Sequence, residues 1–204
     1  MSAAVLTPPA SLPNWFLRAG IRRFSVSEYD ELTRTGVFGP KDRLELLEGY
    51  LVEKMGHNPP HANACFLMLE VVRPLLPAGW VVRGQSPVAL SDSRPEPDAA
   101  VVRGSRGTYA TRHPTPADFG VVVEVSDSSL AEDRDDMGRV YARSGLPVYW
   151  IVNIPERQVE VYTAPQPAAD PPAYASRVDY KPGDAVPLTL DGVTVSVPVA
   201  ELLP

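Results

Sequence analysis

Cysteine is almost absent from this chain of 204 residues, which has a single one, Cys65. One thiol excludes an intramolecular disulfide framework and any zinc cluster built from cysteines. Long hydrophobic runs are also missing, because the longest is far short of the roughly 20 residues that span a bilayer. The first residues have no basic segment of the kind that opens a secretory signal. We therefore expect a cytoplasmic protein with no membrane segment.

Lysine and histidine are scarce. Only three of the 19 Lys and Arg residues are lysines, and the three histidines look too few and too scattered for a histidine-based metal site. The 25 acidic residues give a net charge of −6, which argues against a protein that coats nucleic acid non-specifically but not against a local basic patch. With 44% hydrophobic and 22% charged residues, the composition is that of a folded globular protein.

Several well-known catalytic motifs are absent as well. The chain has no G-x-S-x-G, no Walker-type G-x-x-x-x-G-K-[ST], no H-E-x-x-H and no G-x-G-x-x-G. Cys65 falls on the apolar face of a predicted helix, where a buried and inert thiol is the expected state. The chemistry that remains is that of carboxylates.

The hydrophobic pattern predicts an α/β or α+β protein with a mixed sheet. Ser25 and Glu28 form a capping box that opens a helix through about Thr35, and residues 44–54 predict a hairpin. A second helix after Pro60 is predicted to bury Phe66, Leu69, Val72 and Leu76. Further strands are predicted at 80–84, 86–90, 97–104, 119–126, 147–153 and 158–164, with a helix at 133–145 that ends at a glycine. We expect an N-terminal arm over residues 1–20 and a single domain over 21–204, with a sheet centred on 97–153.

Two carboxylates stand out because predicted strands place them. Asp98 begins one strand, and Glu124 interrupts the valine run of the strongest strand. A charge buried inside such a strand is costly unless it is paired or binds a cation. Oxygen ligands from two adjacent strands suit Mg²⁺, but Glu124 paired with an arginine or at a solvated strand end fits the residues equally well. Glu45, between two leucines of the hairpin, has a similar character.

The segments EPDAAVVRG and ADFGVVVEVSDSSLAEDRDDMGRVYARSGLPVYWIVN carry a family resemblance. Together with LELLEGYLVEKMGHNPPHANA and VRGQSPVAL, they resemble the Uma2 family of the PD-(D/E)XK nuclease superfamily from about Phe24 to the C-terminus. The resemblance implies a restriction-endonuclease-like core, a mixed central sheet flanked by helices, with extra C-terminal strands. It also implies a Mg²⁺- or Mn²⁺-dependent DNA endonuclease, and by analogy a homodimer.

Several residue roles follow from this resemblance. Asp98 and Glu124 would be catalytic metal ligands, with the Val125 backbone carbonyl as a third ligand and Glu45 as an accessory carboxylate. His61 and Gln85 match further positions that are common in such sequences.

The catalytic lysine of the superfamily is missing. The E-x-K pattern would place this lysine at position 126, which is Ser126. Uma2-like sequences move the lysine into the next helix, and the matching residue here is Met137. A thioether can neither orient a water molecule nor neutralise a transition state. Arg134, one helical turn before Met137, and Lys54 on the hairpin are the candidate substitutes.

An arginine cluster flanks the strand of Asp98, and it either forms a rim that contacts DNA phosphates or a solvated loop. Its members are Arg94, Arg103, Arg106 and Arg112. The leading hypothesis is therefore a metal-dependent DNA endonuclease. The alternative is a catalytically degenerate nuclease fold that acts as a DNA-binding or regulatory module.

Overall fold

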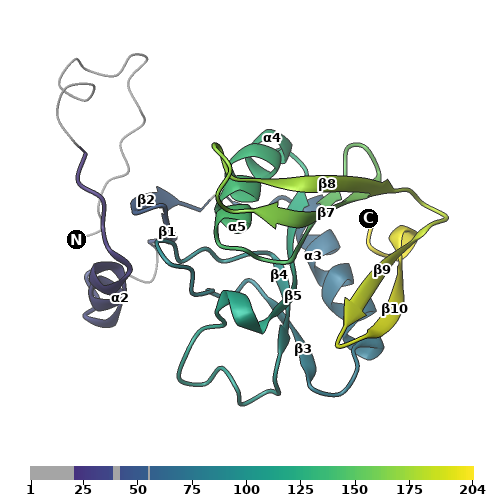
Figure 1. Ribbon diagram of the computed structural model, residues 1–204, viewed down its shortest axis with the longest axis horizontal. Coiled ribbons are helices and arrows are strands. Elements are labelled where there is room, and N and C mark those ends of the chain that lie inside the picture. The colour runs from purple at the N-terminus through teal and green to yellow at the C-terminus, as the bar shows by residue number, and fades with distance from the viewer. Residues whose placement is uncertain (1–20, 39–41, 55) are drawn as a thin grey trace. The chain divides into compact units, whose positions relative to one another are not determined.

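The structure is a computed structural model that describes residues 21–38, 42–54 and 56–204 (Figure 1). It divides into two compact units, one made of residues up to 55 with Ser91–Pro95, and one made of Gly56–Leu90 with Glu96–Pro204. The single domain over residues 21–204 stays a prediction, and the arm over 1–20 lies outside the described residues. In the part of the chain that is described, no helix is both long and apolar enough to cross a membrane.

The smaller unit contains the predicted helix and hairpin. Helix α2 (Val26–Arg34) begins with the predicted capping box, since the side chains of Ser25 and Glu28 bond each other's backbone amides. Strands β1 (Leu44–Leu47) and β2 (Tyr50–Glu53) are antiparallel, and both turn residues, Glu48 and Gly49, have positive φ. Two central residues of that conformation match the right-handed twist of a two-residue hairpin, which explains the glycine.

The larger unit is built on a six-stranded sheet (Figure 1). The strand order is β3-β4-β5-β6-β7-β8, with β5 parallel to β6 and all other neighbours antiparallel. The bounds are β3 Trp80–Gly84, β4 Ala99–Arg103, β5 Phe119–Ser126, β6 Val148–Asn153, β7 Gln158–Gln166 and β8 Ala173–Tyr180. The predicted mixed sheet centred on 97–153 is confirmed. The extra C-terminal strands either extend this sheet or form the hairpin of β9 (Ala185–Leu190) and β10 (Val193–Pro198).

Helices connect and cover the strands. Helix α3 (Pro59–Val72) continues into the 3₁₀ turn η1 (Arg73–Leu75) and precedes β3. Between the parallel strands β5 and β6 the chain forms α4 (Leu130–Glu132), the π-helical turn η3 (Asp133–Met137) and α5 (Gly138–Arg143). This is the crossover that a parallel pair needs. Two further 3₁₀ turns are η2 (Pro116–Asp118) and η4 (Val199–Glu201).

Strand β5 is buried along its whole length, as its valine run predicts. Val121, Val123 and Val125 belong to an apolar cluster that includes the buried side of α3. Val122, on the opposite face, packs in a second cluster with Tyr141 of α5. Because side chains alternate along a strand, Glu124 shares the face of Val122.

Two predictions about this unit are wrong. Residues 86–90 form no strand, because Gln85 takes a positive φ of 42° and turns the chain out of line with β3, although Val88 and Leu90 are buried. Phe66 is 60% exposed, since the residues that α3 buries are Ala64, Cys65, Met68 and Val72. Phe66 lies roughly 145° around the helix axis from the centre of that stripe.

Candidate metal centre

Asp98 and Glu124 lie side by side in the larger unit. The antiparallel register pairs Ala99 with Val123, which puts the residue before β4 opposite the residue that follows Val123. The Asp98 amide donates to Glu124 Oε2 at 3.1 Å, and the Val125 amide donates to Asp98 Oδ2 at 3.0 Å. Both side chains are buried. The strands thus bring together the two carboxylates that the sequence singles out.

Glu124 is surrounded by negative charge. Burial raises its pKa well above the usual value, and the Asp98 and Asp133 carboxylates raise it further, while hydrogen bonds from Tyr141 and the Asp98 amide act against them. The Tyr141 hydroxyl donates to Glu124 Oε1 at 2.5 Å. Among the described residues, the hydrogen-bond partners of the Glu124 carboxylate are thus a tyrosine and a backbone amide rather than an arginine. A cation bound here would relieve this repulsion.

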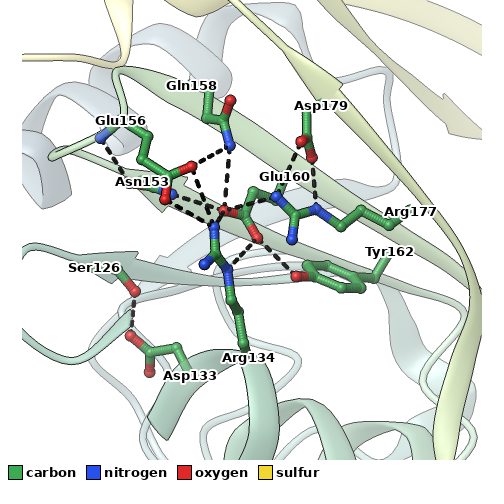
Figure 2. Close-up of polar contacts among 10 residues, drawn as sticks. All are labelled: Ser126, Asp133, Arg134, Asn153, Glu156, Gln158, Glu160, Tyr162, Arg177 and Asp179. Carbon is green, nitrogen blue, oxygen red and sulfur yellow. Dashed lines mark hydrogen bonds and ion pairs between the residues drawn. The ribbon is translucent and has the colours of Figure 1, made fainter. Parts of the chain in front are cut away.

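Asp133 is a third buried acid beside this pair, which the sequence reasoning did not single out. It begins the π-helical turn η3, and its carboxylate accepts hydrogen bonds from Ser126 and, at 2.7 Å, from Ser129. Burial raises its pKa. Ser126 therefore occupies the position of the missing E-x-K lysine and bonds an acid there (Figure 2). Nothing in the sequence indicated the contact between Ser126 and Asp133, because Asp133 is seven residues further along the chain and begins a π-helical turn.

Two histidines face the Asp98 carboxylate. His61 Nε2 lies 3.1 Å from Asp98 Oδ2, and His57 Nε2 lies 3.9 Å from Asp98 Oδ1. The two rings stack with their centroids 4.3 Å apart, and one ligand atom from each of the three residues lies within 4.8 Å of the others. The expectation that the histidines are scattered is wrong for this pair, because the fold brings both rings to one carboxylate. Their four-residue spacing around the start of α3 was the signal that could have found them.

Each histidine has a partner on its other ring nitrogen. Gln85 Nε2 lies 3.0 Å from His57 Nδ1, and the Gln85 amide also donates to the Asp98 carbonyl at 3.2 Å. Cys65 Sγ lies 3.4 Å from His61 Nδ1. Cys65 is buried, as expected. The structure thus places both His61 and Gln85, which the resemblance indicated, around Asp98.

Glu45 and Lys54 belong to the smaller unit. Glu45 lies on β1, and its carboxylate forms an ion pair with Lys54 Nζ at 3.3 Å. Both side chains are largely buried, with exposures of 12% and 16%. Within this unit, the lysine that the sequence offers as a substitute cation thus has Glu45 as a partner.

Arg134 takes part in a second buried network (Figure 2). Its Nε donates to Glu160 Oε2 at 3.0 Å, and its Nη2 bonds both Glu160 and Glu156. Burial alone would raise the pKa of Glu160, but the hydrogen bonds from Arg134, Tyr162 and Asn153 lower it to about 2. Arg177 adds a further ion pair to Glu160 at 3.2 Å.

Met137 has different surroundings from those of Arg134. It is partly buried against the apolar cluster that contains Val140 and Tyr149. The sequence places the two residues one α-helical turn apart on a common face, but the segment that holds them is a π turn, so α-helical spacing does not apply.

Most of the predicted rim arginines are paired with carboxylates. Arg94 binds Asp30 in the smaller unit at 3.0 Å. In the larger unit Arg103 binds Asp191 and Arg112 binds Asp118, the latter at 2.7 Å. Arg106 is exposed in the loop between β4 and β5.

The residues around Asp98 fit a divalent cation. They offer one Asp98 carboxylate oxygen and two imidazole nitrogens within 4.8 Å of one another, with Asp98 buried and both histidines partly buried, and the strongest charged neighbours of Glu124 are negative. Buried like charges in contact are unfavourable without a counter-ion.

The comparisons with known proteins identify the family and the fold of this chain. No curated protein matches the chain. The fold resembles the crystal structure of a "putative nuclease belonging to DUF820" from Anabaena variabilis ATCC 29413, with a TM-score of 0.61 at 15% identity, over 88% of this chain and 97% of that one. The family model Uma2, described as "Putative restriction endonuclease", matches residues 26–198. The chain therefore belongs to the Uma2 family.

Proposed function

We propose that this protein is a metal-dependent endonuclease that hydrolyses phosphodiester bonds in DNA. The observation that carries the proposal is the buried pair of Asp98 and Glu124, in which the Asp98 amide donates to the Glu124 carboxylate and the Asp98 and Asp133 carboxylates raise the pKa of Glu124. Membership of the family described as "Putative restriction endonuclease" supports this reaction class.

Asp98, Glu124 and the Val125 carbonyl would hold the ion, Mg²⁺ or Mn²⁺. Such an ion lowers the pKa of a bound water and offsets charge that develops on the phosphodiester. The chain's own contribution is orientation. The Val125 amide fixes one oxygen of Asp98, while Tyr141 and the Asp98 amide fix both oxygens of Glu124. Ligands held in this way lose little freedom when the ion binds.

DNA is the proposed partner. We propose that the protein binds it as a homodimer, which presents two sites to the two strands. Arg106 is exposed and is the first choice for a phosphate contact. Arg94, Arg103 and Arg112 would have to exchange a carboxylate for a phosphate. Glu45, the accessory carboxylate that the resemblance implies, is neutralised by Lys54 in its own unit.

A degenerate nuclease fold that binds or regulates without cleavage is the second candidate. Its support is Met137, whose side chain packs against an apolar cluster at the position where the resemblance implies a lysine. Arg134, which could replace that cation, already binds the buried Glu160.

Plasmid relaxation separates the two candidates. Supercoiled DNA is incubated with the full chain and Mg²⁺ or Mn²⁺, alongside Asp98→Asn and the control Asp135→Asn, an exposed acid-to-amide change. The proposal predicts nicking by the wild type and the control, and a loss of at least about 100-fold in Asp98→Asn. A silent wild type that gains Asp98-dependent activity from Met137→Lys would instead establish the degenerate form.

A further inference from the structure

We infer that His57 and His61 are ligands of the metal that Asp98 holds, and that the site therefore selects a first-row transition ion such as Zn²⁺ over Mg²⁺. The inference rests on the proposed function for Asp98 as a ligand, and it changes the ion expected there. Neither histidine is needed for the carboxylate site described above.

The orientation of the two rings is the first argument. Both Nε2 atoms face the Asp98 carboxylate, at 3.1 Å for His61 and 3.9 Å for His57. Both Nδ1 atoms face another polar or sulfur atom, of Gln85 and Cys65. A metal-binding histidine has this arrangement, with one nitrogen toward the ion and the other held by an outer partner.

The distances are the second argument. Donors around one ion at about 2.1 Å lie about 3.0 Å apart in octahedral and about 3.4 Å apart in tetrahedral geometry. The distance from His61 Nε2 to Asp98 Oδ2 already falls in this range. The distance from His57 Nε2 to the other carboxylate oxygen, Oδ1, exceeds it by about half an ångström. His61 is fixed on helix α3, where its amide donates to the N-cap residue Asn58 at 3.0 Å. The three donor atoms lie within 4.8 Å of one another, so the His57 ring must move closer to complete the site.

The donor chemistry decides the ion. Mg²⁺ prefers oxygen ligands and keeps several waters, whereas imidazole favours Zn²⁺ and its neighbours in the first transition row. Two imidazoles and one carboxylate form a three-ligand set that leaves positions for water and a phosphate oxygen.

Proton positions follow from ligation. Each neutral ring carries one proton, and a metal on Nε2 requires that proton to be on Nδ1. On His57 the Nδ1 proton would then be donated to the side-chain oxygen of Gln85. Because Gln85 Nε2 now faces this ring nitrogen, the Gln85 side-chain amide must rotate by half a turn when the metal binds. On His61 the Nδ1 proton would be donated to Cys65 Sγ.

Calorimetric titration of the full chain tests the inference. Wild type, His57→Ala, His61→Ala and the control His113→Ala are each titrated with ZnCl₂ and with MgCl₂. His113 is the remaining histidine and lies exposed in the loop before η2. We expect each of the first two changes to weaken Zn²⁺ binding by about tenfold or more, with His113→Ala at wild-type affinity. Mg²⁺ binding should be weaker than Zn²⁺ binding and should change less than threefold. Unchanged Zn²⁺ affinity in His57→Ala and His61→Ala would overturn the inference.

A second measurement on the wild type does not depend on the folding of any variant. Long-range ¹H–¹⁵N spectra of the three imidazoles report which ring nitrogen carries a proton and which binds metal. Zn²⁺ should shift the Nε2 signals of His57 and His61 and leave those of His113 in place, whereas signals of all three that stay unchanged would refute histidine ligation.

The two proposals can fail separately. Zn²⁺ affinity that depends on Asp98 but not on the histidines would overturn this inference and leave the nuclease proposal standing. Histidine-dependent Zn²⁺ binding without any DNA cleavage would support the metal site and refute the proposed function.

Discussion

Replacement of Glu160 by glutamine should be among the most destabilising single changes in the larger unit. The Glu160 carboxylate is fully buried and accepts from Arg134, Asn153 and Tyr162. These bonds lower its pKa from 4.5 to about 2 despite burial. A difference of about 2.5 pKa units corresponds to roughly 3 kcal/mol of stability at pH 7. The neutral amide loses this contribution and leaves the Arg134 and Arg177 charges without their buried partner.

The lowered pKa of Glu160 also predicts how the stability difference between wild type and Glu160→Gln changes with pH. A carboxyl whose folded pKa lies below its unfolded pKa stabilises the protein fully above about pH 4.5, and the contribution disappears as the pH falls toward about 2. The free-energy difference between wild type and Glu160→Gln should therefore be constant near neutrality and should shrink between these two pH values.

Urea unfolding followed by tryptophan fluorescence measures the effect, since Trp80 and Trp150 both lie in the unit that contains Glu160. Glu156→Gln is the matched control, because that carboxylate also binds Arg134 but its side chain is 48% exposed, and its loss should cost less than about 1 kcal/mol. A loss below about 1 kcal/mol for Glu160→Gln, or a difference that grows toward low pH, would refute the reasoning.

Three further changes test other parts of the structure. Glu124→Gln should raise the free energy of unfolding at pH 7 by about 1 kcal/mol or more, because the raised pKa of Glu124 makes its ionised form destabilising above about pH 4.5. In urea unfolding this gain should vanish below that pH, and an unchanged or lower stability at pH 7 would contradict the prediction. Gly120→Ala should cost about 1–3 kcal/mol by the same assay, because a Cβ there would overlap the buried Leu190 side chain, and a neutral effect would mean that the hairpin yields freely. Asn58→Ala should cost about 1 kcal/mol in thermal unfolding, because Asn58 caps α3 through the His61 amide, and a thermally silent variant would show the cap to be dispensable.

Much of the fold could be predicted from local sequence. The capping box at Ser25 and the turn at Gly49 depend on residues close in the chain, and both predictions are confirmed. The valine run of residues 119–126 required burial on both sides, and β5 has it. The adjacency of Asp98 and Glu124 followed from the pairing of two strands, β4 and β5, that are consecutive in the chain and neighbours in the sheet.

The features that sequence reasoning missed depend on contacts between distant segments. His57 lies before α3, and its approach to Asp98 is set by the packing of the helix start against the ends of β3 and β4 rather than by a motif. The partner of Arg134 is Glu160, 26 residues away on β7, and α-helical geometry could not reveal it inside a π turn. The exposure of Phe66 shows the same limit, since the sheet decides which side of an apolar helix is covered.

The most direct test of the central claim is the position of a bound metal ion. Crystals of the full chain grown with Zn²⁺, or with Mn²⁺, are measured at wavelengths on both sides of the absorption edge of that metal. We expect one strong anomalous peak within coordination distance of the Asp98 carboxylate, and we expect it to disappear in Asp98→Asn. A metal bound elsewhere, or an undiminished peak in Asp98→Asn, would contradict it.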